Sequence, residues 1–160
     1  MPTARRSRTL EAAPEEVWAL IADPHHMPRW WPEVKRMEAV EPERWTQVFT
    51  TKHGRTVRMD FRLLESDPPG PAGDPPGRRV WEQEIEGTPF ERVLGEAVTE
   101  VLVEPASHPD GRVGEATRVT IALSQRLRGY SRTGGFLLSR ATRAKLDEAL
   151  ESLEEIVTRQ

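Results

Sequence analysis

The architecture of this protein can be worked out from its last segment, residues 136–158, which reads FLLSRATRAKLDEALESLEEIVT. Four apolar side chains in it recur at spacings of four, three and four residues: Leu146, Leu150, Leu153 and Val157. This spacing places them on one side of an α-helix, and most of the glutamates fall on the other side. A Gly-Gly pair at 134–135 separates the helix from the preceding chain. We therefore predict one long amphipathic helix that buries a continuous apolar stripe.

The chain before this helix is dominated by strand patterns. In the clearest, residues 56–63, polar residues alternate with Val57, Met59, Phe61 and Leu63. A period of two means that one face is buried and the other is solvated. Further strands are predicted at 5–10, 34–40, 44–51, 79–85, 92–103 and 118–127, and helical segments at 13–23 and 27–31. The Pro- and Gly-rich segment 67–77 is predicted as a long exposed loop inside a hairpin.

Two details of these strands predict local structure. Arg5, Arg6 and Arg8 crowd the first strand, which favours an edge position or a solvated face for it. Gly95 interrupts the strand at 92–103 and marks a position for a β-bulge. The predicted order is a strand, one or two helices, about six antiparallel strands and the long helix, which is an α+β arrangement.

Composition restricts the class of the protein. The length of 160 residues predicts a single domain, 1–160, that needs no disulfides or metals for stability, and there is no cysteine. The net charge of −3 and the pI near 5.9 argue against a nucleic-acid partner bound through its phosphates. No apolar h-region follows the basic N-terminus, and no apolar run approaches the roughly 20 residues that span a bilayer. We expect a soluble, cytoplasmic protein without stable membrane insertion.

No motif for catalysis, metal binding or a cofactor is recognisable. His25 and His26 are adjacent, His53 and His108 lie in predicted turns, and no His-Glu-x-x-His spacing exists, so we predict no metal site. Cysteine is absent and no Gly-x-Ser-x-Gly elbow is present, so no nucleophile can be named. No glycine-rich phosphate loop follows a strand, and we expect no cofactor. Whether the protein is an enzyme stays open at this point.

Three carboxylates allow two interpretations. Glu82, Glu84 and Glu86 share one face of the strand at 79–85, opposite Trp81 and Ile85. On the first interpretation they form a solvated outer face. On the second, the register is reversed and one glutamate lies in a pocket as a general base. An Arg or Tyr130, the only tyrosine, could then lie at the pocket mouth as an oxyanion partner.

Four local sequences carry a family resemblance. Residues 13–23 read APEEVWALIAD, 27–34 read MPRWWPEV, 114–120 read GEATRVT and 145–154 read KLDEALESLE. In this order they resemble the first-helix signature, the tryptophan-rich segment, the opening of the last strand and the closing helix of the START/Bet v 1-like superfamily (SRPBCC, or polyketide cyclase/dehydrase-like proteins). The resemblance covers essentially the whole chain. It implies the helix-grip fold, in which an antiparallel sheet of six or seven strands curves around a long C-terminal helix.

Such a fold leaves space between the concave face of the sheet and the helix, where small molecules bind. The candidate lining residues from the strands are Trp45, Phe49, Met59, Phe61, Trp81, Val119 and Ile121. The helix contributes Phe136, Leu137 and Arg140. Trp30, with Trp31, is either an aromatic pair at the cavity entrance or a structural plug between helices. The alternative for all of them is a solid core, because alternation reports burial and not a cavity.

The resemblance implies three classes of function. The first is binding or transport of a hydrophobic small molecule, such as a lipid, a polyketide or a quinone-like compound. The second is a cyclase or dehydratase that uses acid–base residues in the same cavity, and the third is a protein-interaction module. Several arginines surround the start of the last helix and could attract an anionic ligand: Arg126, Arg128, Arg132, Arg140 and Arg143.

Overall fold

The computed structural model describes residues 4–51, 53–107, 115–128 and 135–159, with side chains in the last helix from Ser139 onward. Its strands are β1 (Ala4–Leu10), β2 (Val34–Glu38), β3 (Arg44–Thr50), β4 (Thr56–Asp67), β5 (Gly77–Gln83), β6 (Leu94–Ala106) and β7 (Ala116–Leu127). Its α-helices are α1 (Pro14–Ala22), α2 (Met27–Trp30) and α3 (Gly135–Thr158). Short 3-10 turns occur at η1 (Pro24–His26), η2 (Pro71–Gly73) and η3 (Pro89–Arg92).

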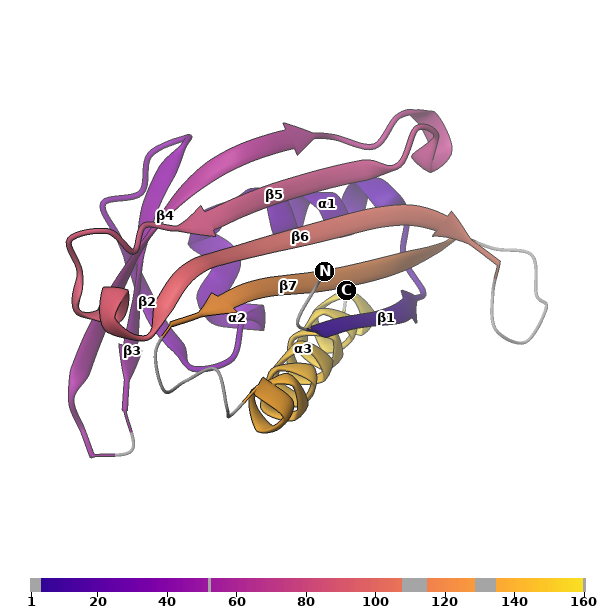
Figure 1. Cartoon of the computed structure of the whole chain (residues 1–160). Helices are drawn as coiled ribbons and strands as arrows, with labels where there is room; N and C mark the ends of the chain where they lie inside the picture. Colours follow the sequence, from indigo (N-terminus) through magenta and orange to yellow (C-terminus); the bar gives the residue numbers. More distant parts are fainter. Residues whose placement is uncertain (1–3, 52, 108–114, 129–134, 160) are drawn as a thin grey trace.

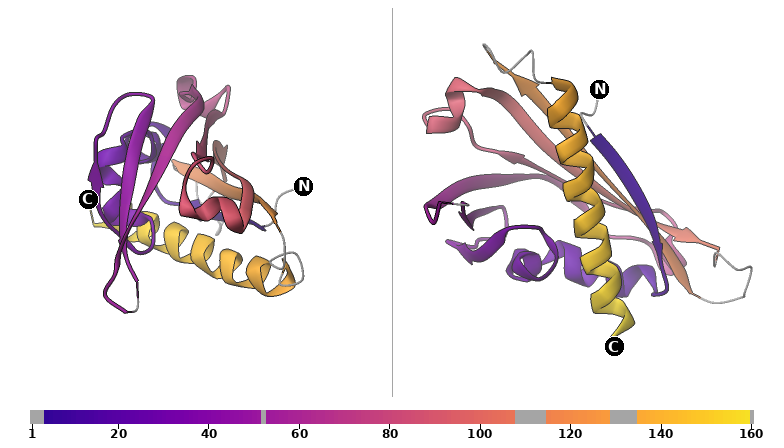
Figure 2. Two further views of the ribbon diagram at one scale, coloured as in Figure 1. Left: turned by 60° about the vertical axis from the view of Figure 1, so that its left-hand side comes forward. Right: turned by 90° about the horizontal axis from the view of Figure 1, so that it is seen from below.

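All seven strands form one antiparallel sheet, in the order β1-β7-β6-β5-β4-β3-β2. The sheet curves, and α3 crosses it diagonally (Figures 1 and 2). The predicted α+β helix-grip fold is therefore confirmed, with seven strands. None of the helices in the described part of the chain is both long enough and apolar enough to cross a bilayer.

The connection between β1 and β2 covers the width of the sheet. Consecutive strands usually pair with each other, but β1 and β2 lie at opposite edges of this sheet. The chain between them forms α1, η1 and α2, and the buried side chains of these helices join the same core as α3. The helical crossover therefore closes one side of the space beneath the sheet.

The predicted apolar stripe of α3 forms the centre of the core. Leu146 and Leu153 are fully buried, Leu150 is 1% exposed, and Val157 is 6% exposed. They pack in one cluster with the inward-facing side chains of β6 and β7, which include Val101 and Ile121. The burial of four large apolar side chains on one helix explains why this helix can hold a curved sheet in place.

The other side of α3 is tied to the edge strand β1 by charge. Arg6 Nε lies 3.0 Å from Asp147 Oδ1, and Arg8 Nε lies 3.3 Å from Glu154 Oε2. The prediction of an edge position for the arginine-rich strand is confirmed, since β1 ends the sheet. Its arginines are partly exposed and pair with the acidic side of the helix.

Several strand boundaries differ from the predicted ones for local reasons. β4 continues past residue 63 to Asp67, because its polar end pairs with the arginines at the start of β5. β2 stops at Glu38 because Ala39 adopts a positive φ of 48°. β6 starts at Leu94, after the 3-10 turn η3. The predicted bulge at Gly95 is confirmed, because the register against β7 shifts between Leu94 and Glu96.

One side chain on the inward face of the sheet is positively charged. Arg79 of β5 is only 4% exposed; its Nη1 donates to Ser66 Oγ at 2.8 Å, and its guanidinium carbon lies 5.6 Å from the centroid of the Trp45 ring. Burial lowers the pKa of Arg79, and the negative charge of Asp23 acts in the opposite direction. Asp23 thus electrostatically links the turn after α1 to the sheet.

Asp23 also organises that turn. Its Oδ1 accepts the backbone N–H of His25 at 3.0 Å and lies 2.9 Å from His25 Nδ1. The backbone hydrogen bond from His25 is the main reason why the pKa of Asp23 lies below its ordinary value of 3.8. The ionised carboxylate therefore favours the folded state.

Truncation of the helix stripe should be much more damaging than the same change at the surface. We expect Leu150→Ala to lower the free energy of unfolding by about 2–5 kcal/mol, because it leaves a cavity in the core. Leu64→Ala is the matched control, since Leu64 is 44% exposed on β4. Urea unfolding of both variants checks this. Equal losses would show that α3 does not form the core.

The Asp23 turn should make stability depend on pH in acid. Asp23→Asn keeps an acceptor for the His25 N–H but removes the charge. Because the pKa of Asp23 is lower in the folded than in the unfolded chain, its contribution is present above about pH 4 and is lost as the pH falls through the folded pKa. In urea unfolding, D23N should therefore be less stable than wild type at about pH 5, and the difference should shrink toward about pH 3. A difference that does not change with pH would contradict this role.

Candidate functional site

A cavity of about 190 Å³ lies between the inward face of the sheet and α3. Most of its lining is aromatic or aliphatic: Trp31, Phe49, Met59, Phe61, Trp81, Phe90, Leu94, Ala97 and Leu123. The remainder is polar, with three amides, one hydroxyl and one ammonium group: Gln47, Gln83, Gln125, Thr99 and Lys145. An apolar enclosure with a few polar groups is typical of a small-molecule site.

Strand register explains why these side chains converge. Trp81 of β5 pairs with Thr99 of β6, and Thr99 pairs with Leu123 of β7. Phe61 of β4 pairs with Gln83 in the same way. Directly paired residues point to the same face of a sheet, so two neighbouring rows of side chains, from four strands, face the helix.

A network of aromatic rings supports the cavity wall. Trp81 makes edge contacts with Trp31, which follows α2, and with Trp45 of β3, with ring centroids 6.1 Å apart in both pairs. Trp45 stacks on Phe61 at 6.3 Å, and Trp30 lies edge-on to Trp31 at 5.4 Å. Because these rings hold one another in place, the wall is preorganised before any ligand arrives.

The polar groups of the cavity differ in what they contact. Gln47 is buried, and its Nε2 donates to Met27 Sδ at 3.0 Å. Gln83 Nε2 is buried and has no acceptor among the described residues. Lys145 Nζ lies 6.0 Å from the centroid of the Phe49 ring. The cavity lining therefore includes two hydrogen-bond donors, on Gln83 and Lys145, for which the described residues supply no acceptor.

A second pocket of about 390 Å³ adjoins the cavity between the α2–β2 turn, β7 and α3. Three residues line both spaces: Leu123, Gln125 and Lys145. The α3 side of this outer pocket combines three short side chains, Ala141, Thr142 and Ala144, with the longer Lys145 and Glu148. A molecule longer than the cavity could therefore extend past Lys145 into the outer pocket.

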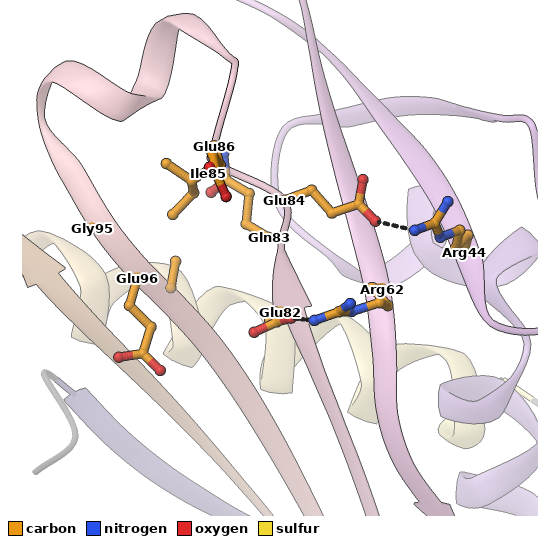
Figure 3. A pocket seen from close by; sticks show the side chains of 10 residues that line it. Arg44, Arg62, Glu82, Gln83, Glu84, Ile85, Glu86, Gly95 and Glu96 are labelled. Carbon is orange, nitrogen blue, oxygen red and sulfur yellow. Dashed lines mark hydrogen bonds and ion pairs between the residues drawn. The ribbon is translucent and has the colours of Figure 1, made fainter.

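A polar pocket of about 350 Å³ lies on the opposite face of the sheet, with α3 behind the strands in the view of Figure 3. Arg44 Nη2 lies 3.3 Å from Glu84 Oε1, and Arg62 pairs with Glu82 (Figure 3). Two of the four carboxylates that line it, Glu82 and Glu84, are thus paired with arginines. Ion pairs at such exposed positions are typical of a solvated sheet face.

This arrangement decides between the two interpretations of the glutamates. Glu82 alternates with Trp81 and Gln83, which line the cavity, so it points away from the cavity. Glu84 pairs with Arg44 on the outer face, and Glu86 is exposed beyond the end of β5. The outer-face interpretation is confirmed, and the reversed register is wrong.

The structure brings four of the predicted lining residues together: Phe49, Met59, Phe61 and Trp81. Four others are buried in the core behind or beyond the cavity: Trp30, Trp45, Val119 and Ile121. Arg140 is exposed on α3. The side chains of Phe136 and Leu137 lie outside the described residues, as do His108, Tyr130 and Arg132.

Sequence reasoning missed the polar part of the lining. Gln83 lies between Glu82 and Glu84 in the sequence, so strand alternation places it on the face of Trp81, but its polarity kept it off the list of candidates. Lys145 lies three residues after Thr142 and four before Ala149, so the helical period places these three side chains next to one another on α3, and its position beside the core could be anticipated. Thr99 and Ala97 gave no signal, because a short side chain leaves space only if its neighbours do not fill it.

The described lining contains no aspartate, glutamate or histidine. Elsewhere in the described residues, no three acidic or histidine side chains lie close enough to hold a metal ion. Chemistry available to the described cavity is therefore limited to apolar contact, hydrogen bonding from amides and a hydroxyl, and the positive charge of Lys145.

Comparison with solved structures places the fold among known ones. The di-domain ARO/CYC BexL from the BE-7585A biosynthetic pathway is 24% identical, with a TM-score of 0.71, over 96% of this chain and 45% of that chain. A START superfamily protein from Mycobacterium smegmatis is 11% identical, with a TM-score of 0.69, over 97% and 96%. TTHA0849 from Thermus thermophilus is 23% identical, with a TM-score of 0.67, over 98% and 97%. At these identities the likeness shows the shared fold.

Family membership is shown by the sequence itself. No curated protein matches the chain. Residues 1–158, however, match the family described as polyketide cyclase/dehydrase and lipid transport. Because this match spans nearly the whole chain and agrees with the helix-grip fold, the protein belongs to the polyketide cyclase/dehydrase and lipid transport family.

Proposed function

We propose that this protein binds or carries a hydrophobic small molecule, such as a lipid, a polyketide or a quinone-like compound, in the cavity between the sheet and α3. The observation that carries the proposal is a cavity of about 190 Å³ lined mainly by aromatic and aliphatic side chains. Family membership supports it, since lipid transport is part of the family description. Burial of an apolar ligand against these rings would supply most of the binding free energy.

The size of the cavity restricts the ligand. An apolar cavity of about 150 Å³ holds one benzene molecule, so about 190 Å³ suits a single ring system. Sites for drug-sized ligands usually enclose about 300–1,000 Å³. A larger ligand would therefore occupy the outer pocket as well, or would displace α3.

The other two functions have less support. A cyclase or dehydratase needs an acid or base beside the substrate, and the described lining supplies neither a carboxylate nor an imidazole. An interaction module needs an exposed apolar patch. Among the described residues, the exposed large apolar side chains are Leu64 on β4 and Val93 between η3 and β6.

The first experiment is native mass spectrometry of freshly purified protein, compared with its denatured mass. A reproducible extra mass that disappears on denaturation would support ligand carriage and identify the ligand class. Thermal shift against a lipid and polyphenol panel provides an independent measurement, because a ligand that binds only the folded state raises the melting temperature. No adduct and no shift would overturn the proposal.

A cavity-filling variant tests the location of the site. We expect Ala97→Leu to weaken binding of any ligand found in this way by about ten- to a hundredfold, because added methyl groups must compete with the ligand for the same space. Ala19→Leu is the matched control, since Ala19 is exposed on α1. Isothermal titration calorimetry on both variants checks this. Unchanged affinity of a folded A97L protein would exclude the cavity as the site.

A further inference from the structure

Lys145 is the only described cavity residue with a full charge. It lies one residue before the buried Leu146 on α3 and is partly exposed, because it lines both the cavity and the outer pocket. The remaining lining is apolar or neutral. A single cation at the junction of an apolar cavity and an open pocket can select ligands by charge.

No carboxylate of the described residues forms an ion pair with Lys145. The neighbouring acidic residue Asp147 is turned toward Arg6 of β1. Glu33 and Glu148 line the outer pocket, but neither forms an ion pair with Lys145. The Lys145 ammonium instead lies against the Phe49 ring, 6.0 Å from its centroid. A cation–π contact leaves the hydrogen-bond donors of the ammonium group available to an oxygen acceptor.

A second unpaired donor belongs to Gln83, which lines the same cavity from the sheet and also the polar pocket on the opposite face. Gln83 Nε2 on β5 is buried and has no acceptor among the described residues. A buried donor without an acceptor costs free energy, and a ligand oxygen would remove that cost. The cavity therefore presents one charged donor from the helix and one neutral donor from the sheet.

We propose that the ligand of this cavity is an aromatic or polycyclic molecule that carries an anionic oxygen, either a carboxylate or an ionised phenol or enol. Its rings lie against Phe61 and Trp81, its anionic oxygen is bound by Lys145 Nζ, and a second oxygen accepts from Gln83 Nε2. This inference rests on the proposed function and specifies its ligand class. Neutral lipids without an acidic group gain nothing from the charge of Lys145 and are disfavoured against anionic ligands.

Matched ligands and variants test this directly. The probes are 2-naphthoate and its neutral methyl ester, titrated by calorimetry into the wild-type protein, K145M and K145R. K145M keeps the apolar stem and removes the charge, whereas K145R keeps the charge. We expect K145M to weaken 2-naphthoate by about ten- to a hundredfold and to leave the ester within about twofold, whereas K145R retains most of the naphthoate affinity.

Two further measurements separate charge recognition from packing. Affinity for 2-naphthoate should fall with added salt in wild type but not in K145M, because only the wild-type contact is electrostatic. Lys35→Met on the exposed strand β2 is the control for an unspecific change of net charge and should leave both ligands unaffected.

The outcomes distinguish this inference from the function on which it rests. If wild type binds the ester as tightly as the naphthoate, or if K145M weakens both equally, the anionic ligand class is overturned and the binding function stands. If neither probe binds and native mass spectrometry shows no adduct, both are overturned. Loss of naphthoate binding alone in a folded K145M supports the inference.

Discussion

The contacts of Trp81 hold this structure together. Trp81 lies on β5, the middle strand of the sheet, and is 1% exposed. Its ring meets Trp31 from the helical crossover and Trp45 from β3, so three elements that are distant in sequence meet at one point. Such aromatic pairs contribute about 0.5–1.5 kcal/mol each beyond the area they bury. The crossover can therefore lie under the sheet and enclose a space beside it.

That space lies where the inward side chains of one strand change from valine to threonine and then to the smaller alanine. Along β6 the inward positions are Ala97, Thr99, Val101 and Val103. The two valines are fully buried in the core with the leucine stripe of α3, whereas Ala97 and Thr99 line the cavity. The same interface between sheet and helix is thus filled at one end and hollow at the other. Protein interiors are close-packed elsewhere, so a hollow of this kind is a built feature rather than loose packing.

The sequence was sufficient to predict the elements of the fold. The apolar period of α3 and the strict alternation in β4 indicated which faces are buried, and the family resemblance implied that the sheet wraps the helix. Strand ends were less predictable. The polar end of β4 remains in the sheet because Arg78 and Arg79 of β5 pair with it, and such a cross-strand contact is invisible in a single segment.

The site was only partly predictable for a related physical reason. Phe61 and Trp81 line the cavity while Ile121 is buried in the core, although all three follow the same alternating pattern. Whether an inward side chain meets a void depends on the length of the residue opposite, which belongs to another element. The donors Gln83 and Lys145 were missed because a search for apolar lining passes over polar residues at inward positions.

The unequal anchoring of α3 has a consequence for kinetics. From Leu146 to Val157 the helix is fixed by its buried stripe, whereas the turn around Ala141 and Ala144 lies over the outer pocket. A ligand too large for the cavity and the outer pocket together would enter only if that turn of the helix moved away while the rest stayed in place. Uptake would then be gated, and its observed rate would reach a plateau with rising ligand concentration, because the opening step and not the collision becomes limiting.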